Sequence, residues 1–295
     1  MTPPLATVAT QFLDRPGLAT STVRSYETAL MPLLQEYGRW PVHLLDRQTV
    51  TEYLEELTGI SYTTHHRHQA ILQALFNFAV ESGHIQTNPI ARLRRRKPDP
   101  AQGEHASDRL IRYLTPDQLQ SLYQAIVNDC RLNTLVRILH RTGARISELL
   151  ALDLIDVDLD RCRFQTIGKG NKRRWCFYSE DAAIALTKYI RFYRHPDTPA
   201  LFTAQHRVSG KVTRLSYRSA HRYWRAAIAD YPELEGARMH DLRHTFATER
   251  VGLMGIEELR ALMGHQNIQT TLHYQKVTSQ QAESAAQRAF RELIS

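Results

Sequence analysis

The pattern of apolar residues breaks between Ala91 and Arg112, and this break constrains the fold more than any other feature of the chain. The stretch ARLRRRKPDPAQGEHASDRL combines a basic cluster with two prolines and a glycine and has no apolar periodicity. This composition is typical of an inter-domain linker. A length of 295 residues is enough for two domains with separate cores. We therefore expect a first domain over residues 1–97, a linker over 98–112 and a second domain over 113–295.

The first domain is predicted to be helical. Apolar residues recur at helical spacing in a segment that opens at Thr20 or Ser21, both N-cap candidates, and closes at Gly38. Two further helical patterns follow, one ending before Gly59 and one over SYTTHHRHQAILQALFNFAVESG, residues 61–83. A compact unit of these helices accounts for the whole region.

Arg67 and three histidines gather near the start of the last of these helices, where free N–H groups could also face phosphates. His65, His66 and His68 have no carboxylate or thiol at a metal-ligand spacing. We favour exposed polar histidines over a metal site.

The second domain opens at Thr115, where T-P-D-Q predicts a capping box with proline at the first helical position. Gly143 interrupts a later helix just before Arg145, and Glu148 lies three residues further on the same face. Between Leu159 and Ser179 the apolar period becomes alternating and is divided by GKGN, which predicts a β-hairpin with Lys169 at its tip. The fold class expected is mainly α with a small β-hairpin in the second domain.

The net charge of +8 and the pI near 9.5 fit a polyanionic partner, although charge alone is weak evidence. The candidate nucleic-acid contacts are the basic residues of the third helix, the linker and the hairpin, namely Arg67, Arg94, Arg95, Arg96, Lys172 and Arg173. The basic run could equally be a solvated tether. No apolar run is long enough to cross a bilayer and the N-terminus lacks a signal-peptide pattern, so we expect an intracellular protein that does not bind membranes. Three unpaired cysteines indicate ordinary thiols.

Six polar residues stand out when the second domain is taken as a whole: Arg145, Lys169, His240, Arg243, His265 and Tyr274. Each alone has an ordinary explanation, such as an arginine paired with Glu148 or a histidine satisfied in a core. Their joint arrangement is what indicates a site.

The segments TGARISELLALDLIDVD, IGKGNKRR, MHDLRHTFAT and LMGHQNIQTTLHYQKV closely resemble the tyrosine recombinase (phage integrase) family, and within it the compact Xer-like members. The resemblance covers the chain from about Thr115 to Thr278, and all six positions of the family pattern are filled. The first hundred residues match more loosely, in helical pattern and in the closing Asn88-Pro89. After GKGNK many relatives continue with a hydrophobic-Val-Pro strand, whereas this chain has RRWCFYSED, which departs from that pattern at the second strand of the hairpin.

The resemblance implies a role for each of the six residues. Arg145 and Arg243 would clamp the non-bridging oxygens of a DNA phosphodiester, and Tyr274 would supply the nucleophile that forms a 3′-phosphotyrosyl link. His240 would accept or manage the tyrosine proton, Lys169 would protonate the departing 5′ oxygen and His265 would add a hydrogen bond to the phosphate. Glu148 would orient Arg145. No metal and no cofactor are implied.

The resemblance also implies an architecture and an assembly. A helical core-binding (SAM-like) domain and the catalytic domain would clamp double-stranded DNA at a short core site. Exchange through a Holliday junction would need four subunits, as a homotetramer or with a related recombinase, whereas the free protein is expected as a monomer or weak dimer. A last helix over residues 278–293 could dock in trans or pack in cis. The expected location is the cytoplasm, at the nucleoid.

Two other functions stay open. A type IB topoisomerase would share the chemistry but relax DNA without sequence choice, and a non-catalytic relative would only bind DNA. The biological role, whether dimer resolution, cointegrate resolution, integration, excision or inversion, and the target sequence are not written in any motif.

Overall fold

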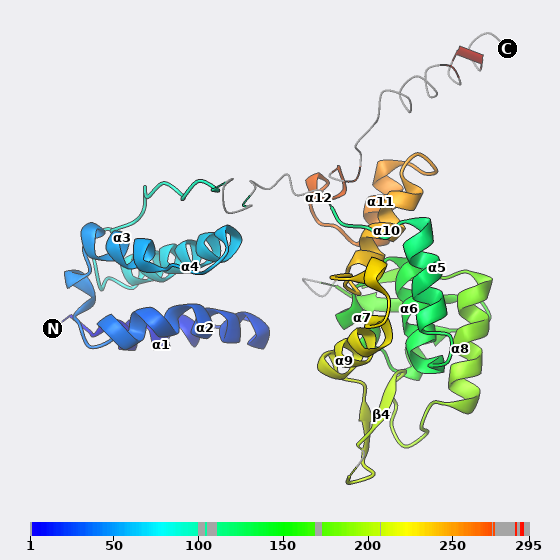
Figure 1. Ribbon diagram of the computed structural model, residues 1–295. Coiled ribbons are helices and arrows are strands. Elements are labelled where there is room, and N and C mark those ends of the chain that lie inside the picture. The colour runs from blue at the N-terminus through cyan, green and yellow to red at the C-terminus, as the bar shows by residue number, and fades with distance from the viewer. Residues whose placement is uncertain are drawn as a thin grey trace. The chain divides into compact units, whose positions relative to one another are not determined.

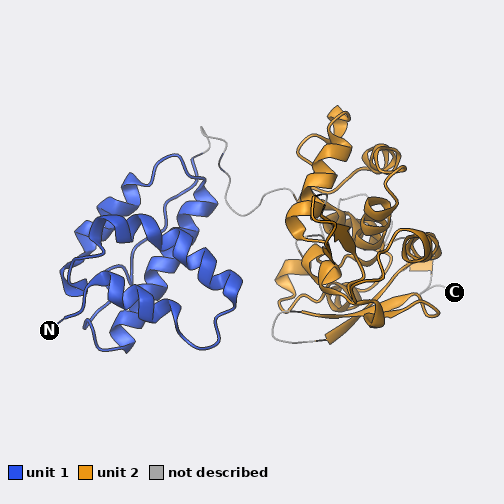
Figure 2. Cartoon of the chain, turned by 90° about the horizontal axis from the view of Figure 1, so that it is seen from below, with its two compact units in different colours: residues 1–109 blue, residues 110–295 orange. Residues whose placement is uncertain are grey.

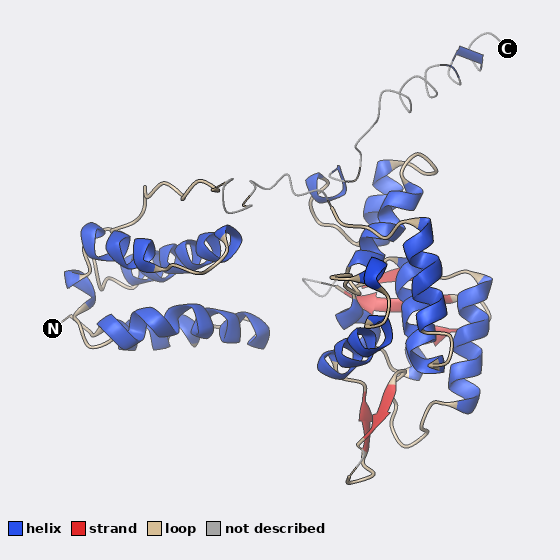
Figure 3. Ribbon diagram, viewed as in Figure 1, coloured by secondary structure: helices blue, strands red, loops and turns tan. Residues whose placement is uncertain are grey.

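The computed structural model describes residues 2–99, 104, 111–168, 173–206, 208–272, 274, 287, 290 and 291. The chain separates into two compact units, Met1–Arg109 and Leu110–Ser295 (Figure 2). Helices dominate both units, and the named strands of the described residues all lie in the second (Figure 3). The predicted fold class, mainly α with a small amount of β-sheet, is confirmed.

Within its described residues, the first unit contains four α-helices and one 3-10 turn (Figure 1). These are α1 (Leu5–Leu13), α2 (Thr20–Tyr37), η1 (Val42–Leu44), α3 (Arg47–Glu56) and α4 (Tyr62–Glu81). Apolar faces of α1, α2 and α4 meet in a core that fully buries Phe12, Leu33 and Phe76. Asp46 and Ser61 cap α3 and α4 by accepting N–H groups with their side chains.

The N-cap predicted at Thr20 or Ser21 was wrong. Both residues lie inside α2, and Ala19 occupies the cap position without a side-chain acceptor. The carbonyl of Ala19 accepts the N–H groups of Thr22 and Val23 at 2.8 and 3.0 Å, so the backbone itself begins the helix one residue earlier.

The histidines of α4 also differ from the prediction of exposed side chains. His65 is 7% exposed and its Nε2 lies 2.9 Å from the carbonyl oxygen of Leu54, while His66 and His68 are partly buried. Their side of α4 packs on other parts of the first unit, which periodicity near the end of a helix does not reveal. Across the described ranges, no group of three or more His, Cys, Asp or Glu side chains could hold a metal ion, and no helix is long and apolar enough to span a membrane.

The second unit contains eight α-helices, two 3-10 turns and five strands within the described residues. The helices and turns are α5 (Pro116–Ala125), α6 (Cys130–Thr142), α7 (Ile146–Ala151), η3 (Leu154–Asp156), α8 (Glu180–Phe192), α9 (Tyr217–Ile228), η4 (Pro232–Leu234), α10 (Asp241–Arg250), α11 (Ile256–Met263) and α12 (Gln269–Leu272). The strands are β1 (Val157–Asp158), β2 (Arg163–Ile167), β3 (Arg173–Phe177), β4 (Thr203–Gln205) and β5 (Val212–Arg214).

Helix α6 is the centre of this unit, since it contacts α8, α9, α10 and β3. It buries Leu135, Val136, Ile138 and Leu139 almost completely, and burial of each such side chain contributes roughly 1.5–3 kcal/mol. In Figure 1, α6 and α8 lie side by side, and α10, α11 and α12 gather at one end of the unit. The core of the second unit therefore fixes where α6 ends and where α10 begins.

The predicted hairpin is present as β2 and β3, which pair antiparallel from Arg163↔Phe177 to Ile167↔Arg173, with β1 added at the other edge of β2. The capping box at Thr115 is also confirmed. A second hairpin of β4 and β5 was not predicted.

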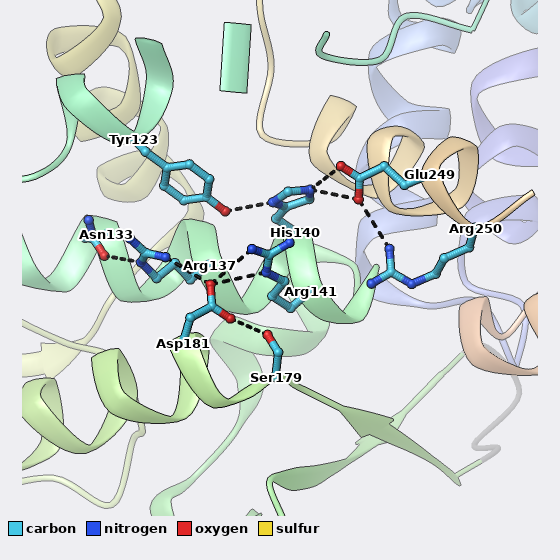
Figure 4. Close-up of polar contacts among 9 residues, drawn as sticks. All are labelled: Tyr123, Asn133, Arg137, His140, Arg141, Ser179, Asp181, Glu249 and Arg250. Carbon is cyan, nitrogen blue, oxygen red and sulfur yellow. Dashed lines mark hydrogen bonds and ion pairs between the residues drawn. The ribbon is translucent and has the colours of Figure 1, made fainter. Parts of the chain in front are cut away.

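A polar network joins α5, α6, α8 and α10 (Figure 4). His140 on α6 is 2% exposed and lies between the Tyr123 hydroxyl, 2.7 Å from Nδ1, and the Glu249 carboxylate, 3.0 Å from Nε2. Asp181 on α8 accepts hydrogen bonds from Arg137 and Arg141. The contact of His140 with Glu249 ties the end of α10 to the central helix α6, and the bonds of Asp181 tie α8 to the same helix.

Candidate active site

Arg145 is placed by the junction between α6 and α7. Gly143 ends α6 in the left-handed conformation, with a φ of 62°, and Arg145 takes the N-cap position of α7. Its backbone N–H donates to Glu148 Oε2 at 2.8 Å and its guanidinium Nη1 donates to Glu148 Oε1 at 2.9 Å. The Arg145 side chain stays 38% exposed, so Glu148 orients a guanidinium that still faces outward.

Arg174 on β3 shares the same carboxylate. Its two Nη atoms donate to Glu148 Oε1 at 2.9 Å and Oε2 at 2.7 Å, and its Nε donates to the carbonyl oxygen of Leu262 at 3.2 Å. Burial alone would raise the pKa of Glu148, but the hydrogen bonds and charge of Arg174, and then the hydrogen bonds from Arg145, lower it to about 2. Glu148 is therefore a carboxylate held between two arginines, and not an acid or base poised near neutral pH.

Arg243, on α10, is 3% exposed and spans two helix ends. Its guanidinium donates to the carbonyl oxygen of Gly143, at the end of α6, and to that of Met263, at the end of α11, the latter at 2.6 Å. Burial, followed by the positive charges of Arg145 and Arg174, lowers the pKa of Arg243 to about 10. The guanidinium remains charged at neutral pH and holds both helix ends together.

His265 follows directly from the end of α11. Gly264 terminates that helix with a φ of 63°, and the backbone N–H of His265 donates to the carbonyl oxygen of Arg260 at 3.1 Å. The ring Nδ1 lies 2.9 Å from the hydroxyl of the fully buried Thr271. Burial, followed by the charges of nearby arginines of which Arg243 is the first, lowers the pKa of His265 to about 4.

Tyr274 lies against two histidines. Its hydroxyl is 2.7 Å from Nδ1 of His244 on α10, and its ring is nearly parallel to that of His265, with 6.5 Å between the centroids and 3° between the planes. The backbone N–H of Tyr274 donates to the carbonyl oxygen of Thr271 at 3.1 Å. Burial raises the pKa of the phenol, although the charges of Arg243 and Arg145 act in the opposite direction.

His240 is the N-cap residue of α10, and its ring meets that of His244 edge to face, with 4.7 Å between the centroids. The side chain is exposed, yet partial desolvation, followed by the charges of Arg243 and Arg238, lowers its pKa. The lowered pKa favours the neutral form of the His240 imidazole.

These side chains surround one open cavity of about 780 Å³, called the cationic cavity below. Its lining includes Arg145, Arg173, Arg174, Arg243, Arg260, His240, His244, His265 and Tyr274. No aspartate or glutamate is among the described residues that line it. Fixed guanidinium donors around a phenol match the needs of a phosphodiester, whose charge lies on its non-bridging oxygens.

The structure thus brings together five of the six predicted residues, Arg145, His240, Arg243, His265 and Tyr274, with Glu148 beside them. Arg173 also lines the cavity. Lys169 and Lys172 lie outside the described residues, as does most of the predicted helix 278–293, of which 287, 290 and 291 are described as helical.

The remaining predicted DNA contacts belong to the first unit. Arg67, Arg94 and Arg95 are exposed. Arg96 is instead paired with Glu104 at 2.6 Å, and its guanidinium lies 5.8 Å from the centre of the Tyr62 ring.

Two residues of the site were missed from the sequence. His244 lies four residues after His240 and therefore on the same helical face, which was an available signal. Arg174 alternates with Arg173 on β3 and points to the same side as the buried Cys176, but its pairing with Glu148 is a contact between distant segments.

Comparison with known proteins gives matches along most of the chain. Residues 112–281 match the model of the phage integrase family. The tyrosine recombinase XerC of Chromohalobacter salexigens is 30% identical over 276 residues, covering 89% of this chain and 86% of the relative. The XerC of Corynebacterium glutamicum is 28% identical over 284 residues, covering 92% and 87%.

Solved structures share the fold. The Tn1549 transposon integrase in complex with a circular intermediate DNA aligns with a TM-score of 0.77 at 21% identity, covering 97% of this chain and 99% of that one. A lambda integrase tetramer bound to a Holliday junction aligns with a TM-score of 0.69 at 17% identity, covering 90% and 78%.

Proposed function

The chain belongs to the phage integrase family and is a tyrosine recombinase, and we propose that the cationic cavity is its active site, with Tyr274 as the nucleophile. The phenolic oxygen attacks a DNA phosphorus. A bond between the tyrosine oxygen and phosphorus forms as the bond between phosphorus and the departing 5′ oxygen breaks. The 3′-phosphotyrosyl link conserves the bond energy. A 5′ hydroxyl of another strand then attacks the same phosphorus and frees the tyrosine.

The observation that carries this proposal is the placement of one partly buried phenol inside a cavity lined by five arginines. Arg145 and Arg243 approach from different helix ends, so their donors can reach two non-bridging oxygens of one phosphate. Such donors act most strongly where water is scarce and they are already oriented. Arg145 has its orientation from Glu148 and Arg243 from two carbonyl oxygens.

Lys169 is assigned to the departing 5′ oxygen, to which it donates a proton. This assignment is supported by the sequence positions of its neighbours. Gly168 and Arg173 both line the cavity, and residues 169–172 connect them in the chain. His240 and His265 are assigned to the phosphate, which both can reach from the cavity wall.

We assign double-stranded DNA contacts to both units, with Arg67, Arg94 and Arg95 on the first and Arg173 at the cavity. Relatives support an assembled state, since lambda integrase is known as a dimer on a core site and as a tetramer on a Holliday junction. One active site cuts one strand, so we propose four subunits per exchange, of this protein alone or with a related recombinase. Residues 278–293 are the candidate for docking onto a neighbouring subunit, and the cytoplasm, at the nucleoid, is the proposed place of action.

The test starts with the Tyr274→Phe variant, which should bind DNA without being consumed. Duplexes that it retains from a random pool, or from DNA flanking its gene, identify a site. A nick placed in that site lets the cleaved fragment leave and traps the adduct. With EDTA present, wild-type protein should become covalently attached to the 3′ end, and Tyr274→Phe should not.

Two results would redirect the proposal. A full adduct with Tyr274→Phe would exclude this nucleophile, and the absence of any adduct on bound sites would favour a non-catalytic DNA-binding protein. Relaxation of plasmids that lack the selected site would favour a type IB topoisomerase. Recombination between two copies of the site is the decisive positive result.

A further inference from the structure

We propose that His244, rather than His240, accepts the proton of the Tyr274 hydroxyl during cleavage and returns it during religation, an inference that rests on the proposed function of the cavity. His244 was not among the residues expected from the sequence. The structure assigns it this role by position, because the atom beside the phenolic oxygen is Nδ1 of His244, at 2.7 Å. That distance is within reach for direct proton transfer.

The hydrogen bonds of the described residues single out one acceptor for the Tyr274 hydroxyl. The ring of His240 meets the ring of His244 edge to face, but the hydrogen bond of the Tyr274 hydroxyl goes to His244. His265 stacks parallel to the phenol, and its Nδ1 is engaged by the Thr271 hydroxyl. Among the three histidines of the cavity, His244 is therefore the one directed at the reacting oxygen.

The backbone holds both partners in place. His244 is in the first turn of α10, directly after Arg243, whose guanidinium is fixed to two carbonyl oxygens. Tyr274 is held by its N–H bond to Thr271 and packs on the small apolar cluster that includes Phe246 and Met263. The short contact thus joins two anchored segments.

Burial, followed by the surrounding charges, favours the neutral form of this histidine before DNA binds. Burial comes first and His240 second in lowering the pKa of His244 to about 4, with smaller contributions from Arg238 and Arg243 and an opposing one from Asp241. From the other side, His244 faces Tyr274, whose own pKa is raised mainly by burial. A neutral imidazole with its proton on Nε2 has a free electron pair at Nδ1, so the phenol donates the hydrogen bond.

The proton balance of the step is complete. The phenolic proton moves to Nδ1 as the oxygen–phosphorus bond forms, which leaves an imidazolium, and the departing 5′ oxygen takes its proton from a separate donor, assigned to Lys169. The phosphodiester brings a negative charge close to His244 and offsets Arg243, so DNA binding favours the imidazolium. On religation the imidazolium returns the proton to the tyrosine oxygen, and Lys169, left neutral by cleavage, takes the proton of the attacking 5′ hydroxyl.

The variant His244→Asn separates proton acceptance from hydrogen bonding. The asparagine amide oxygen occupies the place of Nδ1 and can accept the bond from the phenol, but it cannot take the proton. On the nicked site at pH 7, we expect adduct formation to slow by about 10²–10⁴-fold, with DNA affinity unchanged. The rate should then rise about tenfold per pH unit, as the phenolate fraction rises, up to the pKa of the tyrosine.

Two controls make the result specific. His240→Asn should slow cleavage but keep the wild-type pH dependence. His195 lies in the same unit and outside the cavity lining, so His195→Asn should change neither the rate of cleavage nor its pH dependence. A substrate with sulfur at the departing 5′ position needs no proton donor. It should leave the His244→Asn defect in place while relieving a Lys169→Ala defect.

A rate within threefold of wild type in His244→Asn, or relief of its defect by the sulfur substrate, would overturn the assignment. If His244→Asn fails to bind DNA, His244→Gly decides, because added imidazole should restore cleavage if His244 is the acceptor and should not if it is structural. Failure of the proposed function has a different signature, namely no adduct with wild-type protein or a normal adduct with Tyr274→Phe.

Discussion

Replacing Arg174 by methionine tests whether the carboxylate at the centre of the site depends on this arginine. Arg174→Met keeps an unbranched stem in place of the aliphatic part of arginine and removes the guanidinium, leaving Glu148 with Arg145 as its remaining ion-pair partner. Both side chains of the pair are largely buried, at 12% and 6% exposed. Truncating one partner of such a pair typically costs about 3–5 kcal/mol, because the other charge stays buried.

The pKa of Glu148 gives an independent magnitude. Its fall from 4.5 to about 2 is a difference of about 2.5 pKa units, which corresponds to roughly 3 kcal/mol of stability at neutral pH. Because the folded-state value is lowered, this stability is fully present above pH 4.5 and is lost as the pH falls towards 2. The hydrogen bonds of Arg145 contribute part of this lowering, so we take the two magnitudes together and expect Arg174→Met to lower the free energy of unfolding by about 3 kcal/mol at pH 7.

The assay must report on the second unit alone. In a Trp40→Phe background, the tryptophan fluorescence comes from Trp175 and Trp224, both in that unit. Urea titrations at pH 7 and pH 3 then give the unfolding free energy of each variant, provided that the slope against urea is unchanged.

Two further outcomes follow from the Arg174–Glu148 pair, and a neighbouring arginine gives a control. The difference between wild type and Arg174→Met should shrink at pH 3, since protonation of Glu148 removes the charge that was stranded. Adding Glu148→Gln to Arg174→Met should recover part of the loss at pH 7. The exposed neighbour Arg173→Met should change stability by less than about 0.5 kcal/mol. A loss below about 1 kcal/mol for Arg174→Met, or a difference that does not depend on pH, would refute the reasoning.

Two further changes test how the site is supported. Gly264→Ala should lower the free energy of unfolding by more than about 2 kcal/mol and weaken DNA cleavage, because a Cβ at this left-handed position would lie 2.9 Å from the side chain of Arg174. Gly252→Ala is a control, since Gly252 is also left-handed but has nothing within 4 Å of the added Cβ, and it should lower the free energy of unfolding by only about 1 kcal/mol. Equal losses in the two variants would argue against the steric account. His140→Phe should lower the unfolding free energy by about 1–3 kcal/mol by leaving the Tyr123 hydroxyl unpaired in the network of Figure 4, and Tyr123→Phe in the same background should recover part of the loss in urea titrations.

Local signals explain how much of the fold could be predicted. The capping box at Thr115 and the end of α6 at Gly143 depend on a few neighbouring residues, so their motifs were sufficient. The β4–β5 hairpin was missed because strands of three residues are too short to show alternation, although Ser209-Gly210 in its turn was a usable signal.

The site shows the same division between local and distant information. The spacing of His240 and Arg243 could be read from the chain, and so could the helical relation of His244 to His240. The contact of His244 with Tyr274 joins residues thirty positions apart, and the pairing of Arg174 with Glu148 joins residues twenty-six apart. Such contacts depend on how α10, α12 and the hairpin pack, which no pattern within one element records.

Three arginines lie close together in the site, and hydrogen bonds hold the most buried of them in place against their mutual repulsion. Arg145, Arg174 and Arg243 surround a single carboxylate, so the group carries excess positive charge, and the lowered pKa of Arg243 records that repulsion together with its burial. Arg243 nevertheless stays in place because its planar fork satisfies two carbonyl oxygens, which a lysine could not do in the same geometry. An incoming phosphate would relieve this repulsion. Relief of this electrostatic repulsion would therefore add to the binding energy of the phosphodiester, next to the proposed nucleophile Tyr274.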